Sequence, residues 1–319
     1  MIQKFSSIHS LPIRAIRRIQ REKYRFLNNH PKWVDFPTTI QLDTHNYCNL
    51  ECIYCNPQGS YNIPKGKMPL EMIEYILKYF EGFEVDTFAP FCNGDGLLEE
   101  RLPKITFLAK KYIPYTRVEI FTNGVAYDNK HLLIDENLDT IRFTISASSK
   151  EMYQFIHGKP YYDRVMKTFN WYVDHKLPHQ KLIVNFILTG HNYTELESWK
   201  KQFKEFNQDI RPLHYGFGQE SSYRSKGELS FKDTLKIANM NLKFSEDRPC
   251  MCFHNLSVSW RGEILQCPIV SYDYNYGIIG EVDILQVWRK RFENGLDYSY
   301  CKSCVWKDPN WRDIFQKFS

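Results

Sequence analysis

No run of about 18 consecutive apolar residues occurs in the 319-residue chain, so the sequence predicts no membrane-spanning helix. The N-terminus, MIQKFSSIHS, also lacks the continuous apolar stretch of a secretory signal peptide. The chain has no internal repeat and no low-complexity linker, and its net charge is only +5. These absences give no reason to expect a repeat protein, an exported protein or a general binder of polyanions.

The chain does contain enough apolar residues for a sizeable core, and it is longer than one typical domain. Hydrophobic residues make up 43% of the sequence, and a single domain usually takes about 100–200 residues. We therefore expect one large domain and one small domain. The predicted boundaries are an N-terminal extension at residues 1–37, a large domain at 38–230 and a small C-terminal domain at 245–319.

The N-terminal extension contains a basic segment with apolar residues at helical spacing. Its members are Arg14, Arg17, Arg18, Arg21, Lys23 and Arg25, interleaved with Ile13, Ile16, Ile19 and Phe26. Such a helix could touch a membrane surface or a nucleic acid. We favour packing on the neighbouring domain with solvated charges, because the rest of the chain has no basic concentration. We expect no nucleic-acid partner.

Nine cysteines are present, an odd number that fits a disulfide framework poorly. Without an export signal, they indicate a reducing compartment and metal binding, so we expect a cytoplasmic protein. Three of them, Cys48, Cys52 and Cys55, follow a C-x3-C-x2-C spacing. Three thiolates are too few for a structural zinc site, which normally has four ligands. They suit an iron–sulfur cluster that leaves one iron open to a small molecule.

Strand-like and helix-like segments alternate after residue 38, which predicts an α/β fold with a parallel sheet. The predicted strands are 39–42, 87–91, 117–122, 140–146, 181–188 and 213–217. Helices are predicted at 69–80 and 192–203, where apolar residues recur at helical spacing. Six such units are fewer than the eight of a closed barrel.

The cysteine spacing resembles the signature of the radical S-adenosylmethionine (SAM) enzymes. Here, as in that family, a predicted strand runs directly into the cysteine loop, and Tyr54 fills the aromatic position before the last cysteine. The resemblance implies a partial (β/α)6 TIM-like barrel. It also implies a [4Fe-4S] cluster on Cys48, Cys52 and Cys55, with SAM bound at the open iron.

Two further motifs resemble this family at the ends of the second and third strands. Asn93-Gly94-Asp95-Gly96 resembles Gly-Gly-Glu-Pro, whose backbone and acid hold the SAM ammonium group, although three of its four residues differ. Glycine permits close backbone approach and a carboxylate pairs with a cation. The tetrapeptide Phe121-Thr122-Asn123-Gly124 is one that the family carries after the third strand. Each motif taken alone is also an ordinary turn.

The resemblance suggests three more contacts to SAM. Ser146 follows the fourth strand, where the family often has a serine near the ribose and carboxylate of SAM. An arginine for that carboxylate often follows on the next helix; this chain has His157 in that stretch and Arg164 beyond it. Asn192, after the fifth strand, matches a recurrent polar position near the cofactor and is equally a plain helix cap.

The C-terminal region holds a second group of cysteines. The possible ligands are Cys250, Cys252, Cys267, Cys301 and Cys304. Gly262, five residues before Cys267, predicts a hairpin turn. The pattern resembles the SPASM/twitch modules of radical SAM enzymes, and its shorter twitch form, a hairpin plus a helix, implies one auxiliary [4Fe-4S] cluster. Cys250 or Cys252 would be the first ligand. A zinc site is the alternative.

The resemblance implies that SAM is cleaved reductively to a 5′-deoxyadenosyl radical, which abstracts a hydrogen atom from the substrate. With an auxiliary cluster as electron acceptor, the product would be an oxidised or cross-linked small molecule or peptide. The partners would be that substrate and an electron donor such as a flavodoxin or ferredoxin. Only about 37 residues precede the barrel, too few for a leader-peptide domain, which slightly favours a small molecule.

Two other functions stay open. Cys92, directly before the Asn93 turn, is either a packing residue or a hydrogen-atom donor, and a donor would make the enzyme an epimerase. From a different class, the chain could be a non-catalytic interaction module that binds zinc.

Overall fold

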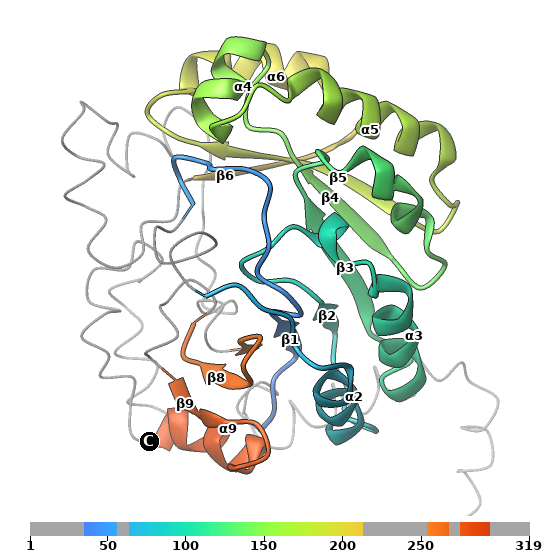
Figure 1. The fold of residues 1–319 in the computed structure, drawn as a ribbon, viewed down its shortest axis with the longest axis vertical. Coiled ribbons are helices and arrows are strands. Elements are labelled where there is room, and N and C mark those ends of the chain that lie inside the picture. The colour runs from blue at the N-terminus through green and yellow to red at the C-terminus, as the bar shows by residue number, and fades with distance from the viewer. Residues whose placement is uncertain (1–34, 56–63, 213–253, 268–274, 294–319) are drawn as a thin grey trace, which may run out of the picture.

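A computed structural model of the chain describes residues 35–55, 64–212, 254–267 and 275–293 (Figure 1). Their strands form one sheet in the order β6-β5-β4-β3-β2-β1-β7-β8-β9. Neighbouring strands from β6 through β1 to β7 are parallel, whereas β7-β8 and β8-β9 are antiparallel pairs. The bounds are β1 Thr39–Leu42, β2 Thr87–Ala89, β3 Arg117–Thr122, β4 Thr140–Thr144, β5 Lys181–Leu188, β6 Asn207–Pro212, β7 Asn255–Val258, β8 Glu263–Leu265 and β9 Asn275–Ile278.

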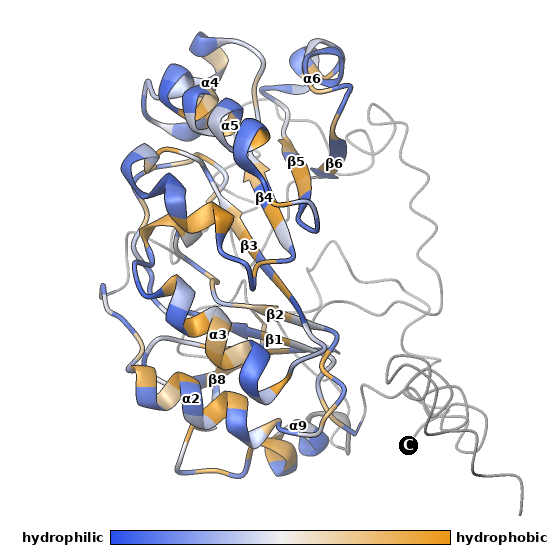
Figure 2. Ribbon diagram, turned by 90° about the vertical axis from the view of Figure 1, so that its right-hand side faces the viewer, coloured by the Kyte–Doolittle hydropathy of each residue, from blue (hydrophilic) through white to orange (hydrophobic). Residues whose placement is uncertain are grey.

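Helices connect the parallel strands and lie on one side of the sheet, as Figure 2 shows for α2 to α5. The α-helices are α2 Leu70–Tyr79, α3 Leu102–Tyr112, α4 Lys150–His157, α5 Tyr162–His175, α6 Leu196–Gln202 and α9 Ile284–Glu293. Short 3-10 segments are η3 Gly96–Leu98, η4 Tyr127–Ile134 and η5 Tyr193–Glu195. No helix in these described ranges is long and apolar enough to cross a bilayer.

The core lies between this helical layer and the sheet. On β1, Ile40 and Leu42 are fully buried and pack in the core, and Thr39 and Gln41 alternate with them on the opposite face. The same alternation gives Val118 and Ile120 on β3, Ile141 and Phe143 on β4, and Val184 and Phe186 on β5. A fully buried side chain of this kind contributes roughly 1.5–3 kcal/mol to folding. The opposite face of the sheet, which we call the inner face, carries most of the polar residues of the strands together with a few apolar ones such as Phe121.

The predicted parallel α/β fold is confirmed. The strands at 39–42, 117–122 and 181–188 have the predicted bounds, and the helix at 69–80 is α2 within one residue at each end. The strand next to β5 in the sheet is β6 at Asn207–Pro212, which was not predicted. The β6 sequence NQDIRP is mostly polar, and a search for apolar runs passes over it. The strand predicted at 213–217 lies outside the described residues. The basic segment at 13–26 also lies outside the described residues.

The hairpin predicted around Gly262 is present as β7 and β8, with Gly262 at a φ of +90° in the turn. It does not stand apart from the barrel, because β7 pairs along its whole length with β1. Asp43 N–H donates to the Val258 carbonyl at 2.8 Å, so the pairing continues to the first residue beyond β1. The sheet is therefore continuous across the predicted domain boundary.

Candidate functional site

The cysteine loop, residues 43–55, begins directly after β1 at the carboxyl end of the parallel strands. Its first four residues, Asp43 to Asn46, are polar and fully buried. Thr44 Oγ1 donates to the Pro90 carbonyl at 2.9 Å, and Asp43 Oδ1 accepts from Asn93 N–H at 3.0 Å. These bonds join the loop to the turn after β2, so two motifs that are far apart in the sequence form one structure.

An ion pair between Arg101 and Glu99 holds the start of the cysteine loop in place. Arg101 donates to the Thr44 carbonyl at 3.0 Å and to the Met68 carbonyl at 2.8 Å, while its other bonds go to Glu99. The Glu99 carboxylate is fully buried. Burial disfavours its charged form, but the hydrogen bonds and charge of Arg101 outweigh this and hold the Glu99 pKa below its usual value. The loop thus rests on a satisfied buried charge pair.

Two glycines let the neighbouring turns approach this loop closely. A Cβ on Gly94 would lie 2.8 Å from the His45 carbonyl oxygen and 2.9 Å from that of Tyr47. A Cβ on Gly158, which ends α4 at a φ of +76°, would lie 2.7 Å from the Glu51 carbonyl oxygen. Glycine is required at both places because backbone meets backbone there. Gly94 thus approaches the cysteine loop closely, and its predicted contact with SAM stays a prediction.

The three thiols of the loop differ in their surroundings. Asn123 Nδ2 lies 3.8 Å from Cys48 Sγ, and His157 Nδ1 lies 3.2 Å from Cys52 Sγ. Cys55 N–H donates to the Cys52 carbonyl at 3.0 Å, which closes a turn between these two cysteines. Burial, and then the charge of Asp95, raises the pKa of Cys48 to about 12. Burial and the neighbouring cysteines raise the pKa of Cys52 well above its usual value.

Asp95 connects the turn after β2 to the turn after β3. Its Oδ1 accepts from Leu97 N–H and its Oδ2 accepts from Asn123 N–H at 2.6 Å, while Thr122 Oγ1 lies within 3.3 Å of both oxygens. Burial raises the Asp95 pKa to about 6 despite these donors. Thr122, Asn123 and Asp95 are therefore brought together as predicted. Both Asp95 oxygens are engaged by the chain, and its contact with SAM stays a prediction.

A second polar group lies on the other side of the cysteine loop. Tyr54 OH is 3.4 Å from Ser146 Oγ and 3.5 Å from His157 Nδ1. Ser146 Oγ also accepts from Ile187 N–H at 3.1 Å. Asn192 holds this group from behind, because its Nδ2 donates to the carbonyls of Ser146 and Ile187 and its Oδ1 accepts from Thr189. Tyr54 and Ser146 are adjacent, while Asn192 positions Ser146.

Arg164 is not brought to this site. It lies on α5, half exposed, and pairs with Asp128 at 3.1 Å. The sequence left the position of the SAM-carboxylate residue open between His157 and Arg164, and His157, at the end of α4, is the one that lies beside the cysteine loop. Cys92 lies between Pro90 and Asn93, beside the start of the loop, and is half-buried. Cys267 follows β8; Cys250, Cys252, Cys301 and Cys304 lie outside the described residues.

Comparison with known proteins decides the family. The family model described as the Radical SAM superfamily matches residues 42–202, half of the chain, from the end of β1 to the end of α6. The chain belongs to the radical SAM superfamily. This match contains the cysteine loop and all the residues described around it, but not Cys267.

Individual relatives are more distant. The chain is 24% identical over 178 residues to the GTP 3′,8-cyclase of Chlorobaculum tepidum, covering 54% of this chain and 52% of the cyclase. The chain thus spans about half the length of this curated relative. Two solved structures share its fold. SuiB of Streptococcus suis, bound to S-adenosylmethionine, has a TM-score of 0.62 at 15% identity and covers 91% of this chain and 75% of SuiB. Native anSMEcpe with bound AdoMet has a TM-score of 0.59 at 15% identity, covering 84% of this chain and 87% of that one.

The residues of the loop fit the cluster that the radical SAM superfamily implies. The donor set is three thiols on one loop, which lose their protons readily only when a cation replaces them. Among the described residues no three His, Cys, Asp or Glu side chains converge closely enough to hold a single metal ion. The thiols of Cys48, Cys52 and Cys55 would each bind a separate iron of the cluster. Asn123 would stay next to the Cys48 sulfur, and His157 next to the Cys52 sulfur.

The residues that sequence reasoning missed are mostly in the first turn of the loop. His45 Nδ1 accepts from Tyr47 N–H at 3.0 Å, and its Nε2 is buried with no hydrogen-bond partner. Burial lowers the His45 pKa to about 4. Asp43 and Glu99 were equally absent from the predicted site. The signal for Asp43 and His45 was a run of four polar residues directly after a predicted strand.

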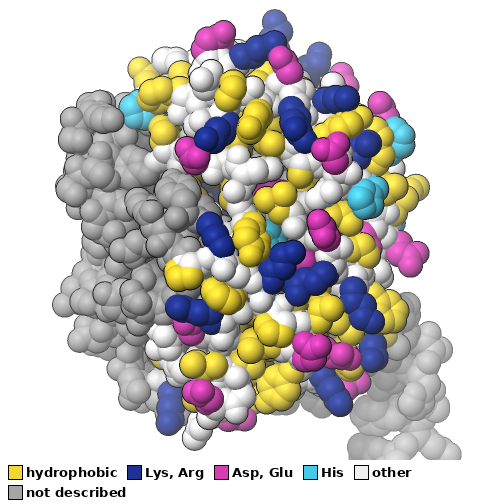
Figure 3. All heavy atoms as spheres, in the orientation of Figure 1, with side chains coloured by type: hydrophobic (Ala, Val, Ile, Leu, Met, Phe, Trp, Pro, Cys, Tyr) yellow, Lys and Arg dark blue, Asp and Glu magenta, His cyan; other side chains and the backbone are white. Residues whose placement is uncertain are grey.

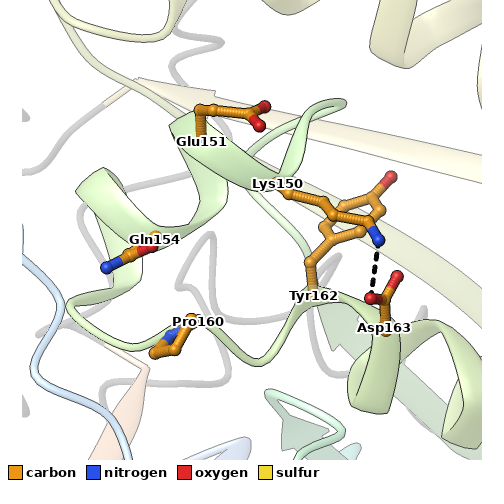
Figure 4. Close-up of a pocket in the computed structure, with 6 residues that line it drawn as sticks. All are labelled: Lys150, Glu151, Gln154, Pro160, Tyr162 and Asp163. Atoms are coloured by element: carbon orange, nitrogen blue, oxygen red, sulfur yellow. Dashed lines mark hydrogen bonds and ion pairs between the residues drawn. The ribbon is translucent and has the colours of Figure 1, made fainter.

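The outer surface offers no comparable arrangement in the parts that are described. A cavity of about 230 Å³ lies on the helical side, and Figure 4 shows the residues that line it. It is lined by Lys150, Glu151, Gln154, Pro160, Tyr162 and Asp163. An exposed ion pair between Lys150 and Asp163 at 2.6 Å crosses it. Figure 3 shows charges of both signs interspersed over the described part of one face. Within the described ranges, the groups suited to cofactor binding are gathered at the cysteine loop.

Proposed function

We propose that this chain is a radical SAM enzyme whose cysteine loop binds a [4Fe-4S] cluster and SAM, and which oxidises or cross-links a small-molecule or peptide substrate. The observation that supports it most is the joining of the cysteine loop to the Asn93 and Thr122 turns through Asp43 and Asp95. When bound, the cluster and SAM supply a 5′-deoxyadenosyl radical that abstracts a hydrogen atom from the substrate. The surrounding residues position SAM, and burial of the site excludes water.

The inner face of the sheet supports a polar substrate. Phe121 on β3 lies under two guanidinium groups, those of Arg142 on β4 at 5.3 Å and Arg211 on β6 at 5.4 Å. Both arginines pair with Asp209, at 2.8 Å and 2.7 Å. Two strands lie between β3 and β6, a distance of about 14 Å across the sheet. Contact between Phe121 and Arg211 therefore requires that the inner face be curved. We call Phe121, Arg142, Asp209 and Arg211 the arginine cluster.

Asn185 lies next to the arginine cluster, on β5 opposite Thr144 of β4. It is fully buried, and neither amide atom has a hydrogen-bond partner. An unpaired buried polar group costs about 1–3 kcal/mol, which a bound ligand with its own donors and acceptors would offset. Asn185 lies two residues before Ile187, whose N–H donates to Ser146. The Asn185 side chain is therefore one residue pair along the strand from the proposed SAM site, toward the start of β5. We assign Asn185 to substrate recognition.

Production of 5′-deoxyadenosine tests this function. The anaerobically reconstituted protein is incubated with SAM and a low-potential reductant, and the nucleoside is measured by mass spectrometry. We expect it from the wild-type chain and only background from a variant with Cys48, Cys52 and Cys55 all changed to Ala. Two clusters predict about eight irons per chain and little zinc. Zinc alone, with no 5′-deoxyadenosine, would contradict the proposal and favour the interaction module.

An epimerase is the second candidate, and the position of Cys92 favours it. Burial raises the Cys92 pKa well above its usual value, so the residue keeps the S–H that a hydrogen-atom donor needs. Donation would form a C–H bond on the substrate radical, break the S–H bond and leave a thiyl radical, which one electron and one proton from the reducing system would restore. For Cys92→Ala, an unchanged product would exclude the donor. Loss of product while the substrate still loses its abstracted hydrogen would support it.

A further inference from the structure

We propose that His157 sets the reduction potential of the cluster by donating a hydrogen bond from Nδ1 to the Cys52 thiolate. This inference rests on the proposed function, because it needs the cluster on the cysteine loop. It makes His157 a positioning residue that acts through a cluster ligand, in the place where the resemblance suggested a residue for the SAM carboxylate.

The hydrogen bonds of the imidazole define its tautomer. Ser146 N–H points at His157 Nε2 at 3.2 Å, and a backbone N–H can only donate, so Nε2 is the acceptor. An Nε2 that accepts this bond carries no hydrogen, so the ring is not an imidazolium. In a neutral imidazole whose Nε2 accepts, Nδ1 carries the hydrogen. That hydrogen faces Cys52 Sγ at 3.2 Å, with Tyr54 OH slightly farther away at 3.5 Å.

The position of the ring is held on several sides. His157 is the last residue of α4, and Gly158 turns the chain immediately after it. The cysteine loop docks on this helix end, because Glu51 N–H donates to the His157 carbonyl at 3.2 Å and Ile53 N–H donates to the Ile156 carbonyl at 2.9 Å. Tyr153 packs against the ring with centroids 4.3 Å apart. The donor therefore has little freedom to turn away from Cys52.

The direction of the effect follows from charge. Reduction adds an electron to the cluster, and part of the added negative charge lies on its thiolate sulfurs. A hydrogen-bond donor stabilises the reduced form more than the oxidised form and raises the reduction potential. Asn123 offers Cys48 a second donor at the longer distance of 3.8 Å, so the contact of His157 is the stronger of the two. Removing the His157 donor is expected to lower the potential.

Three substitutions separate the donor from the packing. His157→Phe fills the same space without a donor, whereas His157→Asn keeps an N–H close to the position of Nδ1. Both variants lose the Nε2 acceptor of Ser146 N–H, so they differ mainly in the donor to Cys52. Tyr153→Phe is the matched control, because it removes a hydroxyl that has no hydrogen-bond partner among the described residues and keeps the ring that packs against His157.

The measurement is a redox titration of the reconstituted proteins, followed by the electron paramagnetic resonance signal of the SAM-binding cluster. A Cys267→Ala background removes a proposed ligand of the auxiliary cluster and simplifies the signal. For His157→Phe we expect full iron loading and a lower midpoint potential, by about a tenfold change in the one-electron equilibrium, or about 59 mV. His157→Asn should recover most of that shift, and Tyr153→Phe should stay near the wild type. Equal potentials in the Phe and Asn variants would overturn the proposal.

A measurement on the unsubstituted histidine covers the case in which the Phe variant does not load iron. In protein labelled with ¹⁵N-histidine, pulsed electron paramagnetic resonance of the reduced cluster should detect one ¹⁵N coupling through the hydrogen bond. Its absence would overturn the proposal. A wild-type protein that holds no cluster would instead refute the proposed function, and the iron content distinguishes the two results.

Discussion

Gly158 shows at the scale of one residue how the cysteine loop depends on a helix end that is far away in the sequence. It ends α4 with a φ of +76°, and its missing Cβ leaves room for the Glu51 carbonyl. Gly82 has a similar φ of +84°, but nothing lies within 4 Å of the place where its Cβ would be. The two glycines therefore share the same backbone requirement and differ in whether they touch the site.

We expect Gly158→Ala to destabilise the chain more than Gly82→Ala and to reduce iron loading. At Gly82 the alanine carries only the left-handed strain, about 1–2 kcal/mol. At Gly158 the same strain is joined by a clash with backbone, which must push the cysteine loop away. Urea unfolding and iron content after reconstitution check this. If both variants lost equal stability and loaded iron equally well, the close approach at Gly158 would have no role.

At the scale of the elements, the pattern of apolar residues predicted the strands with an apolar core face well, but it missed the polar strand β6. β1, β3 and β5 alternate apolar residues on a core face, and their bounds were predictable to the residue. β6 reads NQDIRP, and its polar Asp209 and Arg211 are used on the inner face beside Phe121. A strand with so few apolar residues on its core face is one that a hydrophobic pattern cannot find.

The candidate site was predictable in its motifs but not in its roles. Asp95 and Asn192 are in the expected turns, yet the side chains of both form hydrogen bonds with backbone groups of the protein. Whether a polar side chain faces a ligand or the backbone depends on tertiary contacts that spacing does not reveal. His157 is the opposite case. Its proposed role depends on its contacts with Cys52 and Ser146, and no sequence motif connects these three residues.

At the scale of the whole molecule, the sheet joins the C-terminal hairpin to the cysteine loop. β7 lies between β1 and β8, so it is an inner strand of the sheet. Its Val258 carbonyl accepts from Asp43 N–H, and Asp43 in turn holds Asn93. A C-terminal segment therefore supports the first residue of the loop that carries Cys48.

We therefore expect the hairpin and the barrel to unfold as one cooperative unit. Gly262→Ala perturbs the hairpin turn from outside the site, because its φ of +90° disfavours a side chain and a Cβ would lie 3.0 Å from Met72 Sδ of α2. Hydrogen exchange followed by mass spectrometry should show that this variant loses protection in peptides 255–265 and 39–43 together, since a cooperative unit opens as a whole. Urea transitions followed by circular dichroism and tryptophan fluorescence should coincide in the wild type. Loss of protection in the hairpin peptide alone would mean that the C-terminal strands form a separate unit and that the β1-β7 pairing does not stabilise the cysteine loop.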